Sequence, residues 1–349
     1  DIVYTLYSPT SNSNQLLLGL SDGLHRVVYQ DGAYKDRGPV EAVRHNVRTI
    51  AEGPDGSIWL STFRNGVYRL RLHDSKKSID TVQYYGKQAG FESLRNINVY
   101  TYQGAPVFAT EDGIYRYHAQ QDRFYRDSVF MRGLADPNRC IYTLDHNEAG
   151  NIWICGLNNK QAPVLEGRRL DKDTFQWHST PYQRIPNMMV LDIYADTGQV
   201  VWFAGSEGLF KYQPNPFFTN KSSYPTLIRK VTLNGDSILF YGAFRQNKPH
   251  ASGIKLHQPV SSIPEIDYKD NSLVFHFTAT DLSSPEKNRY SHYLEGFDDS
   301  WSKWEPMNRV RYTNLKAGTY VFHVRAKNIY GMKGQTATYR FTIDRPWYT

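Results

Sequence analysis

The sequence predicts an all-β protein in which β-propeller blades are followed by an immunoglobulin-like or fibronectin-like β-sandwich. Three observations support this prediction. One sequence motif recurs five times before residue 215. Its copies consist of short runs rich in β-branched and aromatic residues, separated by glycine-containing turns. Long helical periodicity is absent, and aromatic residues make up 14% of the chain, including 26 tyrosines, which favours strands.

The recurring motif is clearest at residues 50–62, where two apolar runs flank a glycine-containing turn. Its second glycine turn recurs at Gly23, Gly66, Gly113 and Gly208, and the first two intervals are 43 and 47 residues. The last interval is 95 residues, which is two periods. A period of roughly 40–50 residues that holds up to four short strands is typical of a propeller blade.

Each copy contains Asp-Gly, Asn-Gly or Glu-Gly pairs that predict hairpin turns, because these turns need positive φ. The fourth copy has Asn159-Lys160 in place of the later glycine, and residues 213–216 interrupt the fifth copy before an outer strand. One blade cannot bury both faces of its sheet, so we expect the five blades, in a domain spanning 1–219, to stack around an axis.

A second domain is predicted at 220–349, where the repeat ends and period-two alternation begins. The alternation is clear at 272–277, 319–326 and 338–343, as in half-buried antiparallel strands. Several such strands within about 130 residues favour a β-sandwich. We expect Trp301 and Trp304 to pack in the core or at its edge rather than to bind a sugar.

Composition excludes two classes of function. The net charge is +7 without a block of Lys and Arg, so no nucleic acid partner is expected. No run of 18 apolar residues is present, so no segment of this sequence is expected to span a membrane. The abrupt start at Asp1 and the end at 346–349 are typical of processing boundaries.

The sequence contains no recognisable catalytic or metal-binding pattern, so we expect neither an enzyme nor a cofactor. Residues 145–156 resemble a calcium loop, but position 156 is glycine where an acidic ligand is needed. Asp298 and Asp299 lie in a turn-like segment. Cys140 and Cys155 are expected on adjacent strands, either as buried thiols or as a cross-strand disulfide, and without histidine partners a metal pair is disfavoured.

A ligand-binding surface is predicted from the loops that precede the innermost strands. These loops are basic and rich in amides, and in a propeller they gather on one face together with the turn after the second strand. Arginines on a concave face favour a carboxylated or sulfated ligand, whereas the alternative is a solvated rim. The candidate ligand-binding residues are Arg44, His45, Arg64, Arg95, Arg139 and Arg184.

Both parts of the chain resemble known families. Asp55, Gly56, Trp59 and Thr62 fit the two-component regulator propeller repeat, as do the equivalent positions of the later copies. Residues 290–328 are similar to the three-tyrosine (YYY) domain that follows such propellers. The order of the two is that of the periplasmic sensor region of hybrid two-component histidine kinases of Bacteroides type.

The resemblance implies a function. It implies the periplasmic region of an inner-membrane protein, membrane-adjacent at its C-terminus, that senses an oligosaccharide and passes a signal through the sandwich to a transmembrane helix and a histidine kinase. It also implies a homodimer. The alternative is a secreted propeller that binds carbohydrate or acts as a scaffold. Five blades are fewer than these sensors usually carry, so closure, coverage by a second copy and a longer propeller all stay open.

Overall fold

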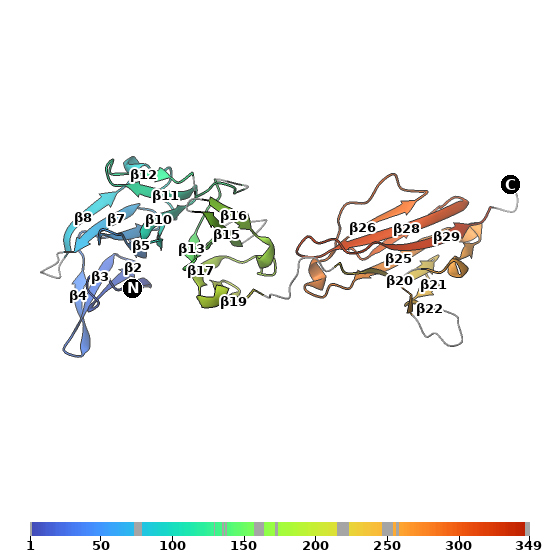
Figure 1. Ribbon diagram of the computed structural model, residues 1–349, viewed down its shortest axis with the longest axis horizontal. Helices are drawn as coiled ribbons and strands as arrows, with labels where there is room; N and C mark the ends of the chain where they lie inside the picture. Colours follow the sequence, from blue (N-terminus) through green and yellow to red (C-terminus); the bar gives the residue numbers. More distant parts are fainter. Residues whose placement is uncertain are drawn as a thin grey trace. The chain divides into compact units, whose positions relative to one another are not determined.

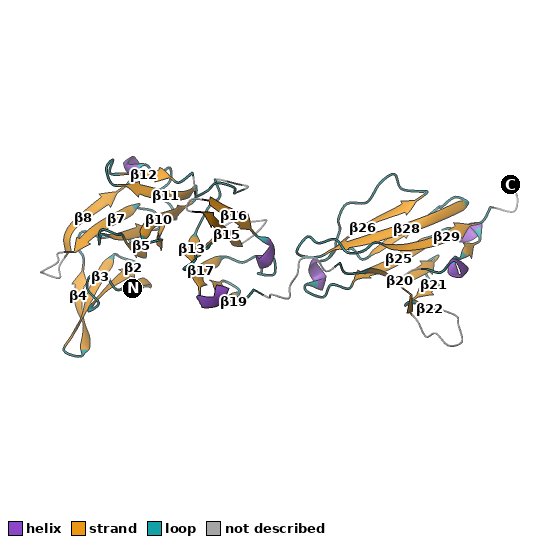
Figure 2. Ribbon diagram, viewed as in Figure 1, coloured by secondary structure: helices purple, strands orange, loops and turns teal. Residues whose placement is uncertain are grey.

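The computed structural model describes residues 2–72, 79–128, 130–134, 136, 138–156, 164–171, 174–214, 223–245, 254–255 and 258–345. The chain divides into two compact units, Asp1–Asn215 and Pro216–Thr349. Strands dominate both units (Figures 1 and 2), and the helices are three-residue 3-10 turns. These turns are η1 (Lys87–Ala89), η2 (Thr180–Tyr182), η3 (Thr197–Gln199), η4 (Val260–Ser262), η5 (Tyr268–Asp270) and η6 (Pro285–Lys287).

The first unit consists of five antiparallel sheets that follow one another along the chain. Blade 1 holds β1 (Val3–Tyr7), β2 (Gln15–Leu20), β3 (Leu24–Gln30) and β4 (Ala33–Pro39), and blade 2 holds β5 (Val47–Glu52), β6 (Ile58–Thr62), β7 (Val67–Leu72) and β8 (Ile79–Tyr85). Blade 3 holds β9 (Asn98–Tyr102), β10 (Ala105–Thr110), β11 (Gly113–His118) and β12 (Arg123–Arg126). Blade 4 holds β13 (Thr143–His146), β14 (Ile152–Cys155), β15 (Val164–Asp171) and β16 (Thr174–His178), and blade 5 holds β17 (Val190–Ala195), β18 (Val201–Gly205) and β19 (Gly208–Tyr212).

This arrangement confirms the predicted propeller architecture. In every blade the strands pair in sequence order, and the first strand of each blade lies beside the first strand of the next, from β1 through β17. Within the described residues the fifth blade has three strands, as its interrupted sequence predicts. The turn at Asn159-Lys160 of the fourth copy lies outside the described residues.

Two physical factors favour the glycine that recurs in the second turn, namely its backbone conformation and, at some positions, the lack of space for a side chain. Gly23, Gly66, Gly113 and Gly208 all have positive φ, between +77° and +153°. At Gly66 a side chain would also collide with its neighbour, because a Cβ there would lie 2.2 Å from the carbonyl oxygen of Tyr85 at the end of β8. At Gly66 the turn therefore needs both the positive φ and the missing side chain, whereas at Gly208 a Cβ would meet no atom within 4 Å and only the positive φ favours glycine.

Buried side chains between neighbouring blades form the core of the first unit. Trp59 of blade 2 is 1% exposed and packs edge-on against Phe108 and Phe124 of blade 3, with ring centroids 5.4 and 5.8 Å apart. Trp153 holds the equivalent place in blade 4, where its indole Nε1 donates a hydrogen bond of 2.6 Å to the hydroxyl of Tyr182. The tryptophan of the repeat thus joins each of these blades to the next.

The second unit contains two four-stranded sheets and a short hairpin. One sheet has the order β21 (Ser237–Tyr241), β20 (Thr226–Leu233), β25 (Leu273–Ala279) and β27 (Arg309–Tyr312). The other has the order β24 (Glu265–Ile266), β29 (Ala337–Ile343), β28 (Gly318–Lys327) and β26 (Arg289–Glu295), with β24 parallel to β29. The hairpin pairs β22 (Phe244–Arg245) with β23 (Ile254–Lys255).

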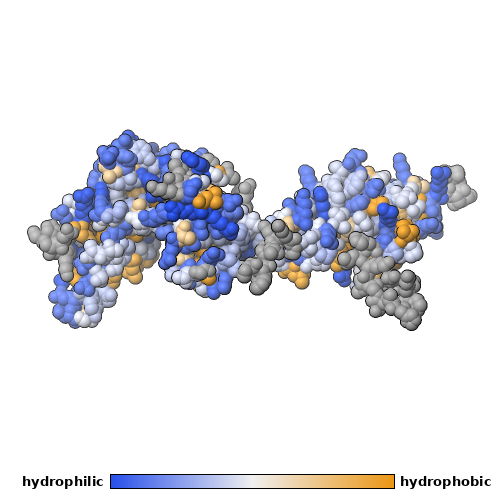
Figure 3. Space-filling view, in the orientation of Figure 1, coloured by the Kyte–Doolittle hydropathy of each residue, from blue (hydrophilic) through white to orange (hydrophobic). Residues whose placement is uncertain are grey.

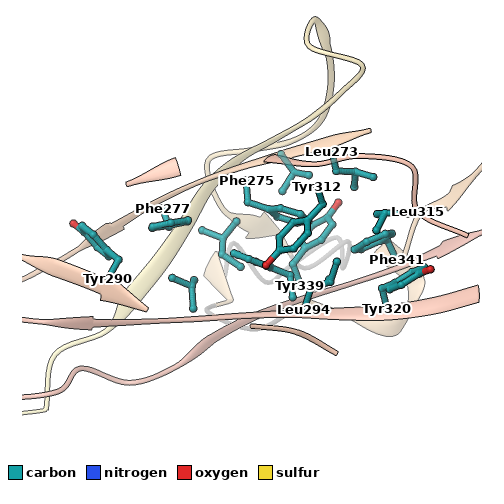
Figure 4. Packing of buried hydrophobic residues seen from close by; sticks show 14 of the residues in the cluster. Leu273, Phe275, Phe277, Tyr290, Leu294, Tyr312, Leu315, Tyr320, Tyr339 and Phe341 are labelled. Carbon is teal, nitrogen blue, oxygen red and sulfur yellow. The ribbon is translucent and has the colours of Figure 1, made fainter. Parts of the chain in front are cut away.

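Aromatic and aliphatic side chains of both sheets fill the space between them (Figure 4). Phe275 of β25 stacks on Phe322 of β28 with ring centroids 4.0 Å apart, and Tyr320 stacks on Phe341 at 5.3 Å. These residues occupy alternate positions along their strands, so the predicted period-two pattern corresponds to the inner face. Figure 3 shows mainly hydrophilic side chains on the visible surface of each unit.

Asp298, in the turn-like segment, belongs to a group of hydrogen-bonded side chains at one end of this core. The carboxylate of Asp298 accepts hydrogen bonds from the Leu294 amide at 2.8 Å and from the Tyr312 hydroxyl at 2.7 Å. The same hydroxyl lies 3.0 Å from Nδ1 of His292. Burial lowers the pKa of His292 and raises the pKa of Tyr312. Asp298 therefore fixes a turn.

Trp301 and Trp304 lie on the outer face of the second sheet, at the edge beyond β26. The segment that carries them pairs with β26 through hydrogen bonds between Tyr290 and Glu305. The guanidinium of Arg325 lies 4.0 Å from the Trp301 ring centroid and 5.2 Å from that of Trp304. The two tryptophans thus clamp an arginine and hold the loop against the sheet.

Gly66→Ala should destabilise the protein more than Gly104→Ala does. Both glycines have φ near +75°, but a Cβ at Gly104 would meet no atom within 4 Å. Gly104→Ala should therefore cost about 1 kcal/mol of unfolding free energy, and Gly66→Ala at least about 2 kcal/mol more. Chemical denaturation of both variants measures the difference, and equal losses would contradict the collision with Tyr85.

Tyr312→Phe should cost about 1–2 kcal/mol of unfolding free energy, because it leaves Asp298 and His292 without their shared hydroxyl. Tyr339→Phe is the matched control. Tyr339 is 2% exposed and belongs to the same core, but its hydroxyl forms no hydrogen bond with the described residues. The control should change stability by less than about 0.5 kcal/mol. Thermal unfolding of the two variants tests whether the hydroxyl network matters.

Candidate ligand-binding site

The loops that precede the innermost strands meet the turns after the second strands, as a propeller requires. The amide of Phe63, in the β6–β7 turn, donates a hydrogen bond of 3.1 Å to the side-chain oxygen of Asn46. The amide of Asn96, before β9, donates one of 2.9 Å to the Phe63 carbonyl. These bonds place the basic loops of blades 2 and 3 on one face of the first unit.

The six candidate residues of this face differ in their surroundings. Arg44 is exposed and its guanidinium lies 3.4 Å from the carboxylate of Glu41. His45 is half-buried and its Nδ1 hydrogen-bonds the Tyr68 hydroxyl. The remaining four are Arg64, Arg95 and Arg184, which are exposed, and Arg139, which is half-buried and whose pKa is lowered by burial.

Carboxylates are interleaved with these arginines. Glu111 accepts hydrogen bonds from Asn96 at 2.7 Å and from Ser93 at 3.3 Å, in the loop that also carries Arg95. Burial and the charges of Glu92 and Glu111 raise the pKa of Asp112. The loop face is therefore of mixed charge rather than a continuous basic ring. The assignment of the six residues to a ligand stays a prediction.

A second group of side chains extends from the innermost strands, and Arg48 of β5 lies in it. Its guanidinium is 4.4 Å from the ring centroid of Tyr4 on β1 and 5.2 Å from that of Phe63. Its Nη2 donates a hydrogen bond of 3.3 Å to the hydroxyl of Tyr142, which precedes β13. Blades 1, 2 and 4 therefore converge on one guanidinium.

Acidic and phenolic groups continue this cluster towards blade 5. The hydroxyl of Tyr100 on β9 donates a hydrogen bond of 3.1 Å to the Tyr142 carbonyl, and the carboxylate of Asp145 on β13 accepts one of 2.7 Å from the Ala195 amide. Burial raises the pKa of Asp145. Burial and the nearby charge of Asp145 raise the pKa of Asp192 on β17. We call Tyr4, Arg48, Tyr100, Tyr142, Asp145 and Asp192 the inner-strand cluster.

The inner-strand cluster offers polar recognition. No carboxylate of the described residues forms an ion pair with Arg48, so most of its five N–H donors stay available. Aromatic rings flank that guanidinium, and two carboxylates lie further along the cluster. Donors, acceptors and aromatic faces together suit a polyhydroxylated ligand that carries a negative group. Within the described residues no group of three potential metal ligands gathers.

Arg48 is not among the six residues predicted from the sequence, because that prediction rests on the loops before the innermost strands and Arg48 lies within β5. In the sequence it follows Arg44 by four residues. Cys155 is buried, which raises its thiol pKa, and it forms no disulfide with Cys140. Of the 145–150 segment, Asp145 and His146 end β13, and 147–150 form the turn that leads to β14, closed by hydrogen bonds between Asn147 and Asn151.

A family comparison identifies the C-terminal part of the chain. Residues 281–344 match the Y_Y_Y domain. They span β26 to β29, including Tyr290, Tyr312 and Tyr320 of the sandwich core. No curated protein sequence matches the chain significantly.

Two solved structures of extracellular domains are similar to this chain. The extracellular domain of the hybrid two-component system BT3049 from Bacteroides thetaiotaomicron is 21% identical over 98% of this chain, with a TM-score of 0.54. The extracellular domain of BT4673, a hybrid two-component system of the same organism, is 17% identical over 99% of this chain, with a TM-score of 0.41. This chain covers 44% of the first structure and 51% of the second.

The chain thus shares the fold of the BT3049 extracellular domain, with propeller blades followed by a sandwich that contains the Y_Y_Y match. The expected resemblance to the sensor region of Bacteroides-type hybrid two-component systems is confirmed. The chain spans less than half the length of the BT3049 domain. Within the described residues no helix has the length and apolarity needed to cross a membrane.

Asp192→Asn should stabilise the first unit at neutral pH. The raised pKa of Asp192 means that its ionised form is disfavoured in the fold, so the folded state loses stability as the pH rises through that pKa. The uncharged side chain of asparagine avoids this loss of stability, and its oxygen can still accept the 2.9 Å hydrogen bond from the Ile193 amide. Thermal unfolding at pH 7.5 should show a higher Tm than the unchanged protein. The gain should shrink towards pH 4, near the ordinary aspartate pKa. A gain independent of pH would show that the ionised carboxylate of Asp192 is not what destabilises the fold.

Proposed function

We propose that this chain is the extracytoplasmic ligand-sensing region of a two-component signalling receptor. The observation that carries the proposal is the order of the two units, because the propeller blades of residues 1–215 are followed by a second unit whose residues 281–344 match the Y_Y_Y domain. The extracellular domain of BT3049 has the same fold. The absence of a recognisable catalytic pattern in the sequence agrees with sensing rather than catalysis by this region.

The proposed ligand is an oligosaccharide that carries carboxylate or sulfate groups. The support is chemical: Arg48 has a guanidinium without an acidic partner among the described residues, and Tyr4 and Tyr142 contact it. Guanidinium forks bind such groups through paired hydrogen bonds, and exposed aromatic rings pack against sugar rings. Exposed arginines of the loop face, Arg64 and Arg95 among them, would extend contacts with a longer chain.

The proposed signal is a shift between two states of a receptor dimer. A ligand favours a state only by the difference in its affinity for the two states. In the proposal, the sandwich passes this preference to a transmembrane helix and a histidine kinase. The predicted membrane-adjacent segment, 346–349, lies outside the described residues.

Arg48→Gln should weaken binding of a charged oligosaccharide by about tenfold or more, because it removes a charge-assisted hydrogen-bond donor. Isothermal titration of the chain with tetragalacturonate and with the neutral maltotetraose measures this effect. Arg123→Gln, at an exposed position of β12, is the matched control and should bind as the unchanged chain does. Equal binding of both sugars, or binding that Arg48→Gln leaves intact, would refute the assignment.

The receptor role has its own test. The gene's full-length product, expressed with a transcriptional reporter, should respond to the binding oligosaccharide, and Arg48→Gln should shift the response to higher ligand concentration. A protein that binds the sugar but shows no kinase-dependent response would instead be a carbohydrate-binding propeller without a signalling role.

A further inference from the structure

The net positive charge of the chain resides in its second unit. Residues 216–349 contain eighteen Lys and Arg against eleven Asp and Glu, which gives a net charge of +7. Residues 1–215 contain twenty-three of each kind and are neutral overall. The positive excess of the chain therefore lies entirely in the second unit.

Three basic side chains form a straight row across one sheet of the sandwich. The register pairs Lys230 of β20 with His276 of β25, and His276 with Arg309 of β27. Their neighbours Val231 and Phe275 face the core, so the row lies on the outer face. We call Lys230, His276 and Arg309 the basic row.

The basic row lacks compensating charge. None of its three side chains forms an ion pair or a hydrogen bond with any described residue. Burial and the positive charges of Lys230 and Arg309 lower the pKa of His276. The lowered pKa favours the neutral form of His276, so the row presents two cations, Lys230 and Arg309, on either side of a histidine. An anionic partner would supply the counter-charge that the described residues do not give these two cations.

The geometry limits what that partner can be. Neighbouring strands are about 4.8 Å apart, so the row spans roughly 10 Å in a line across the sheet. Arg311 extends the positive charge along the outer edge of β27, where it is exposed. At the other end of the row Tyr241 pairs with Lys230 and is 72% exposed, which leaves its ring free for contact. The cations Lys230, Arg309 and Arg311 therefore extend across the sheet from an exposed aromatic ring. This arrangement matches a linear polymer with repeated anionic groups and a sugar ring to stack.

We propose that the basic row, together with Tyr241, binds a sulfated or carboxylated polysaccharide strand. The site lies on the second unit, and the proposal holds whether or not the inner-strand cluster binds a sugar. Arg309 engages a sulfate or carboxylate through its planar fork, Lys230 engages a second group as a point charge, and the Tyr241 ring packs against a sugar ring.

The test uses the full chain and a heparin-derived octasaccharide, with neutral maltooctaose as the uncharged probe. The double variant Lys230→Gln with Arg309→Gln should bind the heparin probe at least about tenfold more weakly and with a shallower dependence on salt. Lys287→Gln with Lys316→Gln removes the same charge from exposed positions outside the row and should bind as the unchanged chain does. Repeating both titrations in an Arg48→Gln background separates this site from the inner-strand cluster.

Two further measurements keep the proposal falsifiable. The double variant Lys230→Gln with Arg309→Gln should unfold at an unchanged or higher temperature, because it removes like-charge repulsion. Tyr241→Ala should weaken heparin binding severalfold without a change in charge. The proposal is overturned if the row variant binds heparin as its matched control does, or if maltooctaose binds equally well. It is also overturned if vesicles of phosphatidylglycerol, and not heparin, bind in a row-dependent manner.

Discussion

The burial of both faces of a small sheet is the constraint on which the first unit depends. A blade of three or four short strands has two apolar faces and no core of its own, so only another blade can exclude water from them. The repeat meets this need by placing an aromatic side chain on the second strand, as Trp59 and Trp153 show. Hydrogen bonds between backbone and side-chain groups also fix how neighbouring blades align. The Val99 amide, for example, donates to the Thr49 hydroxyl at 2.7 Å.

The same stacking creates the inner-strand cluster. Because the first strands of successive blades lie side by side, side chains far apart in the sequence converge, and Tyr142 reaches Arg48 across 94 positions. The result is a polar surface of mixed charge. A cation without an acidic partner among the described residues lies at one end, and two carboxylates with raised pKa values lie at the other. Such a surface can hold a ligand with both neutral hydroxyls and an anionic group.

Local sequence rules predicted the strands and turns because their causes are local. Positive φ at Gly66 and the alternation at Phe275 are properties of a few neighbouring residues. The position of Trp301 depends on a loop that pairs with β26 and on an arginine of β28, so composition could not locate it. Arg48 posed the same difficulty, since its partners come from three blades. The basic row needed strand register, which only the paired sheet supplies.

The contacts between successive blades determine how the first unit unfolds. When each sheet relies chiefly on its immediate neighbours, stability is a sum of nearest-neighbour terms, and opening need not involve the whole unit at once. The outermost sheets have the fewest such neighbours, and Leu6 and Leu209 leave 65% of their surface in water. Amide hydrogens of β1 and β19 should therefore exchange with solvent through partial fraying. Those of β9, which has a blade on either side, should exchange only when a larger part of the unit unfolds.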